Sequence, residues 1–146
     1  MKVRYGRSMD DRLMPSDSIY VAQSRIPNAG RGVFAAVGIK EGEVIERCPV
    51  IEMMEPDIRA RLNELSLRNY YFTWGEERER AAVALGYGSI YNHSFAPNAC
   101  YIKRIPERRI DFIALKDIVK NEEILVNYNG DPADQSPLWT GAIDPE

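Results

Sequence analysis

Histidine and cysteine are scarce in this sequence, and their scarcity excludes most kinds of metal site. The 146 residues include one histidine, His93, and two cysteines, Cys48 and Cys100. A structural zinc site takes about four cysteine or histidine ligands, so these three residues cannot build one and we expect no metal. Two isolated cysteines are more often free thiols than a disulfide in an intracellular protein, although a disulfide between them stays open.

Long apolar runs are missing as well. No stretch approaches the roughly 18 apolar residues that a membrane helix requires, and the first residues lack the apolar core of a secretory signal. We therefore expect no membrane association and an intracellular protein, cytoplasmic by default, with nuclear placement or delivery as a secreted effector left open. The net charge of −3 gives no general attraction to nucleic acid, so we expect no direct nucleic-acid binding. Nothing indicates the oligomeric state.

Short β-rich runs separated by turn residues are what the chain has in abundance. Strands are predicted within 19–22, 33–37, 44–53, 70–74, 81–86 and 122–128. Pro49 predicts a strand break or an edge position within 44–53. The runs 100–105 and 109–115 flank a short loop and predict a β-hairpin, and Asn121 suits a left-handed turn position.

One helix is predicted over 55–69. Pro56 suits its first position, and Ile58, Leu62 and Leu65 would share an apolar face. The chain is thus expected to be a mainly β, or α+β, protein. We divide it into an N-terminal extension at 1–18, one domain at 19–129 and a C-terminal tail at 130–146.

Three stretches combine residue types that suit a binding site. "NAGRGVFA" (28–35) places two glycines directly before a strand, where they allow positive φ or a close backbone approach. "NHSFAPNACY" (92–101) holds the single histidine in a polar loop without strand or helix periodicity. "EEILVNY" (122–128) ends a strand on Tyr128 rather than placing the tyrosine in its middle.

In this order and at these separations, the three stretches resemble the SET domain, the fold of S-adenosylmethionine-dependent protein-lysine methyltransferases. The resemblance runs from about Ile19 to Tyr128. It implies a β-clip fold of small curved sheets, with an inserted helix and a knot-like threading of the C-terminal segment. It also implies methyl transfer from S-adenosyl-L-methionine, leaving S-adenosyl-L-homocysteine, to the ε-amine of a lysine in a protein or peptide, with histones or other basic proteins as possible targets.

The resemblance further implies a set of site residues. Tyr128 and Tyr101 match the catalytic and channel-lining tyrosines, and His93 would position the site rather than act as a base. The cofactor-binding residues would be Ala29, Gly30, Arg31, Gly32, Asn92, His93, Tyr128 and Trp139. Trp139 matches by its place after the last strand and not by a motif.

Two departures from the family pattern bear on the site. The chain has no cysteine-rich zinc-binding tail, so residues around Trp139 would have to close the cofactor pocket. Cys48 stands where many members carry a tyrosine, which leaves the channel lining and the degree of methylation open.

Alternative interpretations accompany these expectations. Some of the aromatic residues 70–74 could line a substrate groove, although strand alternation favours a core position for part of them. The basic residues Lys103, Arg104, Arg108 and Arg109 could meet nucleic acid or an acidic partner, but we expect them to guard a solvated hairpin edge. A SET-fold module that has lost activity but binds the cofactor or a partner is the main functional alternative, and a Cys48–His93 hydrolase is a weaker one.

Overall fold

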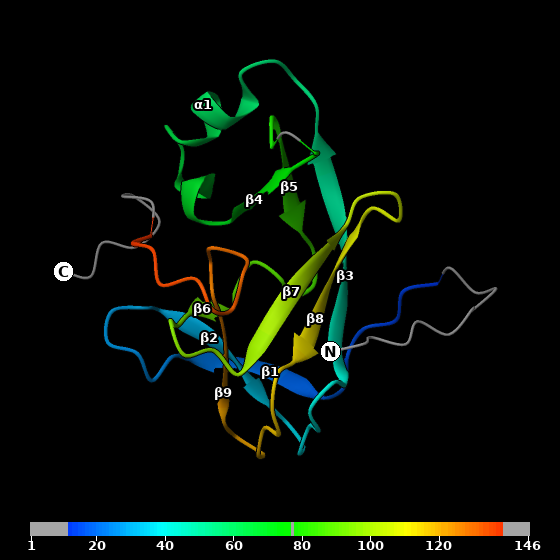
Figure 1. The fold of residues 1–146 in the computed structure, drawn as a ribbon, viewed down its shortest axis with the longest axis vertical. Helices are drawn as coiled ribbons and strands as arrows, with labels where there is room; N and C mark the ends of the chain where they lie inside the picture. Colours follow the sequence, from blue (N-terminus) through cyan, green and yellow to red (C-terminus); the bar gives the residue numbers. More distant parts are fainter. Residues whose placement is uncertain (1–11, 77, 139–146) are drawn as a thin grey trace.

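The computed structural model of the protein describes residues 12–76 and 78–138 (Figure 1). Two curved, mostly antiparallel sheets make up most of it, and one small helical segment lies at the end of the larger sheet (Figure 1). The elements are β1 (Ile19–Gln23), β2 (Arg31–Ala35), β3 (Val44–Met53), α1 (Ile58–Leu62), the 3-10 helix η1 (Ser66–Asn69), β4 (Tyr71–Trp74), β5 (Arg80–Ala84), β6 (Asn92–His93), β7 (Ala99–Arg104), β8 (Arg109–Ala114) and β9 (Glu123–Val126).

The strands form two sheets that share one core. The first sheet has the order β1-β2-β9-β6 and the second the order β4-β5-β3-β8-β7. Val33 and Ile124 of the first sheet belong to the same apolar cluster as Ile110 and Phe112 of the second. The mainly β character predicted from the sequence is confirmed.

The prediction for Pro49 is wrong, because β3 runs unbroken through it in the middle of the larger sheet. β3 pairs with β8 as far as Pro49 opposite Arg109, and from Val50 onward it also pairs with β5. Pro49 lacks an N–H but still accepts the N–H of Leu85 at 2.9 Å. A proline is tolerated here because the pairing with β8 ends at this position.

The predicted helix over 55–69 is also wrong in extent. α1 spans only Ile58–Leu62, and a separate 3-10 turn follows at Ser66–Asn69. Asp57 lies at φ 61°, so it cannot continue a right-handed helix back to Pro56. Ile58 and Leu62 are buried as expected, whereas Leu65 is 55% exposed.

Several local predictions are confirmed. β7 and β8 form the expected hairpin, and Asn121 adopts φ 70°. Cys48 and Cys100 are free, buried thiols. Of the predicted N-terminal extension, the described part is attached to the domain, since the Ser16 hydroxyl donates to the Ile45 carbonyl at 2.7 Å.

The element that positions the site is β9. It pairs with β2 on one side, antiparallel, and with the two-residue strand β6 on the other, parallel. Asn98 fixes the segment after β6 to β9, because its amide donates to the Glu123 carbonyl at 2.9 Å and its side-chain oxygen accepts the Leu125 N–H at 2.8 Å. The glycine stretch, the histidine stretch and the tyrosine-ended strand are thereby brought side by side.

Candidate active site

Two cavities meet at the end of β9. The larger, of about 470 Å³, lies between the 26–31 loop and β6. The smaller, of about 200 Å³, is lined by six aromatic residues, which include Tyr71 and Phe72 of β4 and Tyr101 of β7. Both are lined by Asn69, Tyr70, Ser89 and Tyr128. A group held in one cavity can therefore lie next to a group held in the other across the side chain of Tyr128.

The larger cavity is walled by the glycine stretch. Ala29, Gly30 and Arg31 line it, and Gly30 takes φ 71° with open space where a Cβ would be. Gly32 does not line the cavity. It is buried beneath the loop, where a Cβ would collide with the Glu123 carboxylate and approach the Asn92 amide nitrogen to 3.1 Å. Gly30 therefore shapes the cavity, and Gly32 permits the packing under it.

Glu123 is the group that holds this packing together. Its buried carboxylate accepts the Ser24 hydroxyl at 2.6 Å and the Arg25 N–H at 3.1 Å. The same carboxylate accepts the Asn92 amide at 3.1 Å. Asn92 also donates to the Arg31 carbonyl at 3.0 Å. One carboxylate at the start of β9 thus joins the loop before β2 to β6. Hydrogen bonds to a charged acceptor are stronger than those between neutral groups.

His93 is tied to the backbone of the tyrosine. Its Nδ1 accepts the N–H of Tyr128 at 3.0 Å, and its ring meets Phe95 edge-on with 4.4 Å between centroids. Burial lowers the pKa of His93 below its ordinary value of 6.5, so the imidazole is neutral at pH 7. The proton is then on Nε2, which is buried and has no hydrogen-bond partner among the described residues.

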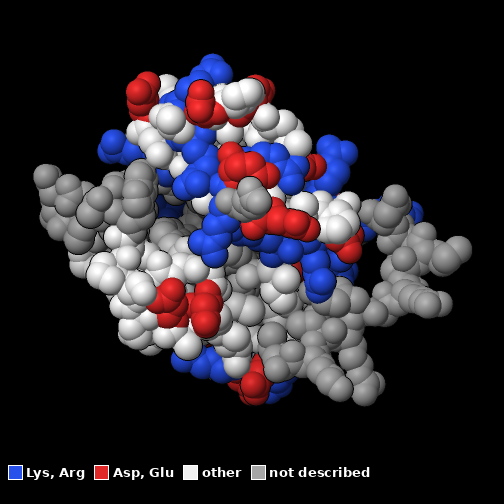
Figure 2. Space-filling view, turned by 45° about the horizontal axis from the view of Figure 1, so that its top comes forward, with Lys and Arg blue, Asp and Glu red and all other residues white. Residues whose placement is uncertain are grey.

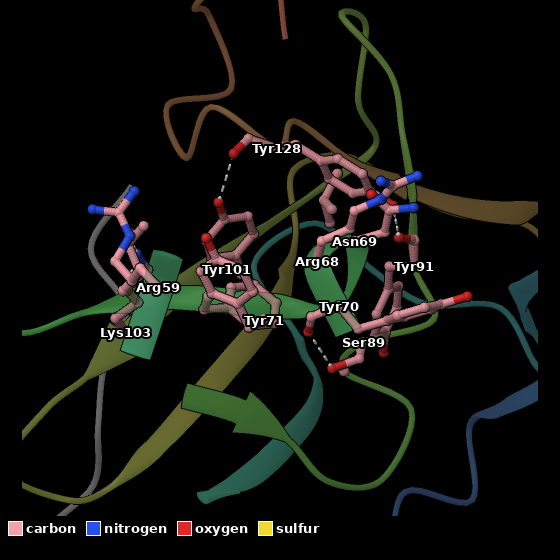
Figure 3. Close-up of a pocket in the computed structure, with 14 residues that line it drawn as sticks. Arg59, Arg68, Asn69, Tyr70, Tyr71, Ser89, Tyr91, Tyr101, Lys103 and Tyr128 are labelled. Atoms are coloured by element: carbon pink, nitrogen blue, oxygen red, sulfur yellow. Dashed lines mark hydrogen bonds between the residues drawn. The ribbon is translucent and has the colours of Figure 1, made fainter. Parts of the chain in front are cut away.

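Tyr128, Tyr101 and Tyr91 form a linked set between the cavities (Figure 3). The Tyr128 hydroxyl donates to the Tyr91 carbonyl at 2.7 Å, and the Tyr101 hydroxyl donates to the Tyr128 carbonyl at 3.1 Å. Burial raises the pKa of Tyr101 to about 12 and raises that of Tyr128 as well. Both are therefore neutral phenols at pH 7, with their protons engaged and their oxygen lone pairs left to face a ligand.

Aromatic residues make up much of the lining of the smaller cavity. Six aromatic residues line it, and Tyr70, Tyr71, Tyr91, Tyr101 and Tyr128 are labelled among them in Figure 3. Of the aromatic stretch 70–74, only Trp74 is fully buried in the core. The prediction that part of this stretch is core is confirmed by Trp74, and Tyr70, Tyr71 and Phe72 line the smaller cavity. Their place in a substrate groove stays a prediction.

Cys48 lies behind the wall of the smaller cavity rather than on it. A Cβ on the cavity-lining Gly88 would come within 2.9 Å of the Cys48 sulfur. The neighbouring Glu46 carboxylate is buried and accepts the Tyr91 hydroxyl at 3.0 Å. Burial, reinforced by Glu46, raises the pKa of the Cys48 thiol. The thiol thus stays protonated at neutral pH, which gives no support to a Cys48–His93 hydrolase.

The four basic residues of the β7–β8 hairpin are not alike, and the prediction that they guard a solvated edge is confirmed only for Arg108, whose side chain is 72% exposed. Arg104 and Arg109 lie 3.6 and 3.0 Å from the fully buried carboxylate of Asp111, and Arg108 pairs with Glu52 at 2.8 Å. Lys103 instead lines the smaller cavity. Sequence reasoning missed this because residues of an edge strand alternate between solvent and the sheet face.

Four further residues of the site were not found from the sequence: Glu123, Tyr91, Asn98 and Lys103. The first lies within the "EEILVNY" stretch, and the next two lie within or beside "NHSFAPNACY", so the motifs carried a signal for them. Lys103 had no such signal. Trp139, expected to close the larger cavity, lies outside the described residues.

The larger cavity fits a nucleoside cofactor such as S-adenosylmethionine. Its volume falls in the range of small-molecule sites, about 300–1,000 Å³. It offers two polar groups to a ligand. One is the buried Nε2 of His93, which has no hydrogen-bond partner among the described residues. The other is the side-chain oxygen of Asn92, since the amide nitrogen of that side chain already donates to Arg31 and Glu123. An open loop at Gly30 allows a ligand to approach the backbone closely. No group of three acidic, cysteine or histidine side chains in the described part of the chain could hold a metal ion.

Comparison with known proteins agrees with this geometry. The sequence pattern of the SET domain family matches residues 30–129. The chain is 32% identical over 99 residues to a histone-lysine N-methyltransferase of Schizosaccharomyces pombe specific for lysine 37 of histone H3, covering 68% of this chain and 66% of that protein. It is 30% identical over 125 residues to the histone-lysine N-methyltransferase EZH2 of Chaetomium thermophilum, covering 76% of this chain and 8% of that protein. The chain thus spans just under two thirds of the first relative and a small part of the second.

Solved structures give the same result. A Plasmodium falciparum protein considered a candidate histone methyltransferase superposes with a TM-score of 0.60 at 33% identity, covering 76% of this chain and 92% of that one. The Chaetomium thermophilum Polycomb Repressive Complex 2 in an autoinhibited conformation, bound to S-adenosylmethionine, superposes with a TM-score of 0.62 at 27% identity, covering 77% of this chain and 15% of that one.

The protein belongs to the SET domain family, whose methyltransferases use S-adenosylmethionine. The family and fold predicted from the three sequence stretches are confirmed.

Proposed function

We propose that the protein transfers a methyl group from S-adenosyl-L-methionine to the ε-amine of a lysine in another protein. The observation that carries this proposal is the meeting of two cavities at Tyr128, one polar and one aromatic. Family membership and the relatives named as histone-lysine methyltransferases support it. In this proposal the cofactor occupies the larger cavity and the lysine side chain enters the smaller one.

The smaller cavity would prepare the nucleophile by excluding water. A free lysine amine has a pKa of about 10.4 and is protonated at neutral pH. Burial among the rings of Tyr70, Tyr71 and Tyr101 favours the neutral amine, because a charged group loses hydration there. A neutral amine is the form that can attack a methyl carbon.

The tyrosines would orient the amine rather than remove its proton. The hydroxyl protons of Tyr101 and Tyr128 are donated to carbonyl groups of the protein, so each oxygen can only accept from a ligand. An amine N–H can donate a hydrogen bond to such an oxygen. This bond fixes the direction in which the amine approaches the methyl carbon. Orientation of this kind can account for much of the rate of a transfer between two bound groups.

The residues of the larger cavity would hold the cofactor so that its methyl group lies on the line along which the amine approaches. When bound, S-adenosylmethionine supplies a methyl group made electrophilic by its positively charged sulfur. Gly30 and its neighbours would contribute backbone contacts, and Asn92 an acceptor oxygen. His93 would contribute its Nε2–H and hold the backbone of Tyr128 in register with both cavities.

A lysine-containing protein is the substrate that this proposal requires. The relatives named as histone-lysine methyltransferases support an intracellular protein. No helix in 12–76 or 78–138 has the length and apolarity to cross a bilayer.

A transfer assay tests the proposal and separates it from its main alternative. The full chain is incubated with S-adenosylmethionine carrying a labelled methyl group and with a pool of lysine-containing proteins. Label on protein lysine supports the enzyme. Cofactor binding by calorimetry without transfer supports an inactive SET module, and the absence of both binding and transfer contradicts the proposal.

A further inference from the structure

Two cationic side chains line the smaller cavity on the side of Tyr101 away from Arg68 (Figure 3). These are Lys103 and Arg59. Lys103 donates to the Thr73 carbonyl at 2.6 Å and to the Thr73 hydroxyl at 2.9 Å, so its ammonium is fixed by neutral groups only. Arg59 donates to the backbone carbonyl of Arg78 at 2.9 Å, so the loop that carries Arg78 lies beside it.

No carboxylate of the described residues forms an ion pair with any of these three cations. Figure 2 shows lysine and arginine side chains gathered on the part of the molecule where α1, β4 and β5 lie, with acidic side chains among them. The described acidic residues of this region that form ion pairs do so with other arginines: Glu79 with Arg80 at 3.2 Å and Glu52 with Arg108 at 2.8 Å. The cations at the cavity are left without a partner of opposite charge within the described chain.

This grouping has an electrostatic cost in the free protein. Burial, followed by the positive charges of Arg78 and Arg59, lowers the pKa of Lys103 to about 8. Like charges that converge without a counter-charge repel each other, and an anion bound among them removes the repulsion. An arrangement of this kind is therefore complementary to a negatively charged ligand group.

We propose that Arg59, Arg78 and Lys103 form an anion subsite that binds an acidic side chain close to the target lysine of the substrate. This inference rests on the proposed function, because it assigns the target lysine to the adjoining cavity. The anion is assigned to the substrate chain because Arg59 and Lys103 line the cavity that receives the lysine, with Arg78 in the neighbouring loop. Substrates with an acidic residue beside the lysine are then preferred over uniformly basic segments.

Matched peptides test the subsite. Each pair holds one lysine and differs only in an Asp or an Asn, placed at successive positions on either side of it. At the best position we expect kcat/KM to be about fivefold higher for the acidic peptide, as for a partly exposed ion pair. The preference should weaken as salt is added, because ions screen exposed charges. A phosphoserine arm distinguishes a phosphate from a carboxylate as the preferred anion.

Variants assign the preference to these residues. Arg59→Gln and Lys103→Met should each reduce the ratio of kcat/KM for the acidic and neutral peptides towards unity. The ratio corrects for any change that the variant makes to the overall rate. Lys116→Met, an exposed lysine outside both cavities, is the matched control and should keep the full preference. Equal rates on acidic and neutral peptides at every position, or a preference unchanged in both variants, overturn the subsite.

A binding measurement separates failure of the subsite from failure of the proposed function. Fluorescence anisotropy of the same peptides, with S-adenosylhomocysteine present, needs no methyl transfer. Tighter binding of acidic peptides that Lys103→Met abolishes supports the subsite even when no transfer is seen. Transfer without any preference between the paired peptides contradicts the subsite and leaves the enzyme standing.

Discussion

The Nδ1 atom of His93 accepts the backbone N–H of Tyr128 at 3.0 Å, and so joins β6 to the residue that separates the two cavities. The two residues are far apart in sequence but adjacent in space, because β6 and β9 pair in parallel. A change at His93 therefore reaches the site through the backbone of Tyr128, whereas a change at the Tyr128 hydroxyl reaches it directly.

Replacement of Tyr128 by phenylalanine removes the hydroxyl of the residue that lines both cavities. We expect turnover to fall about 100-fold, as for other losses of a positioned group at a reacting centre, with cofactor affinity nearly unchanged. The fold should stay intact, because the side chain still packs against the core. Single-turnover methyl transfer and S-adenosylhomocysteine binding measure the two effects. Tyr87→Phe, outside both cavities, is the control, and a full rate in Tyr128→Phe removes this hydroxyl from the mechanism.

The pKa of His93 can be read without interference, since the chain has one histidine. We expect its ring proton resonances to titrate below the ordinary value of 6.5, because burial disfavours the imidazolium. The folded pKa lies below the unfolded one, so the stability contribution is present above pH 6.5 and is lost as the pH falls through the folded pKa. Titration above 6.5 contradicts the neutral, accepting imidazole described for the site.

Gly32→Ala tests the packing under the glycine stretch. The added methyl group collides with the Glu123 carboxylate and crowds the Asn92 amide, so we expect a loss of about 2 kcal/mol in the free energy of unfolding together with weaker S-adenosylhomocysteine binding. Gly42→Ala, at φ 84° in open space, should cost only about 1 kcal/mol from backbone strain and leave binding unchanged. Denaturant unfolding and calorimetry compare the two. Equal effects on binding would mean that Gly32 has no special role.

The preference for acidic peptides should depend on pH. Lys103, with its pKa lowered to about 8, is charged below that value and loses its charge above it in the free protein. Tyr101, with its pKa raised to about 12, stays neutral over this range. The ratio of kcat/KM for acidic and neutral peptides should therefore be highest below pH 8 and decline as the pH rises further, since the neutral peptide corrects for titration of the target lysine. A ratio that rises over the same range contradicts a role for Lys103.

The sequence allowed prediction of those parts of the site whose residue types are unusual for their surroundings. A single histidine in a polar loop and a tyrosine at a strand end stood out, and the structure brings His93 and Tyr128 into contact. Lys103 was not predictable, because its position facing Thr73 depends on how β4 and β7 approach each other across the cavity. The linking role of Glu123 likewise depends on a contact with Ser24 that spans most of the chain.

The fold was predictable in class but not in two details. Turn residues such as Asn121 act locally, and its left-handed conformation followed from its residue type. Asp57 also takes a left-handed conformation, which ended the predicted helix early, and nothing in the neighbouring residue types indicates it. The continuity of β3 through Pro49 depends on a change of pairing partners, which is a property of the whole sheet.

The most direct test of the account is a crystal structure of the full chain with S-adenosylhomocysteine and a lysine-containing peptide bound together. The account predicts the nucleoside in the larger cavity, against Gly30 and His93, and the lysine amine in the aromatic cavity on the other side of Tyr128. A nucleoside bound away from both residues, or a lysine that enters by the same cavity as the cofactor, would contradict it.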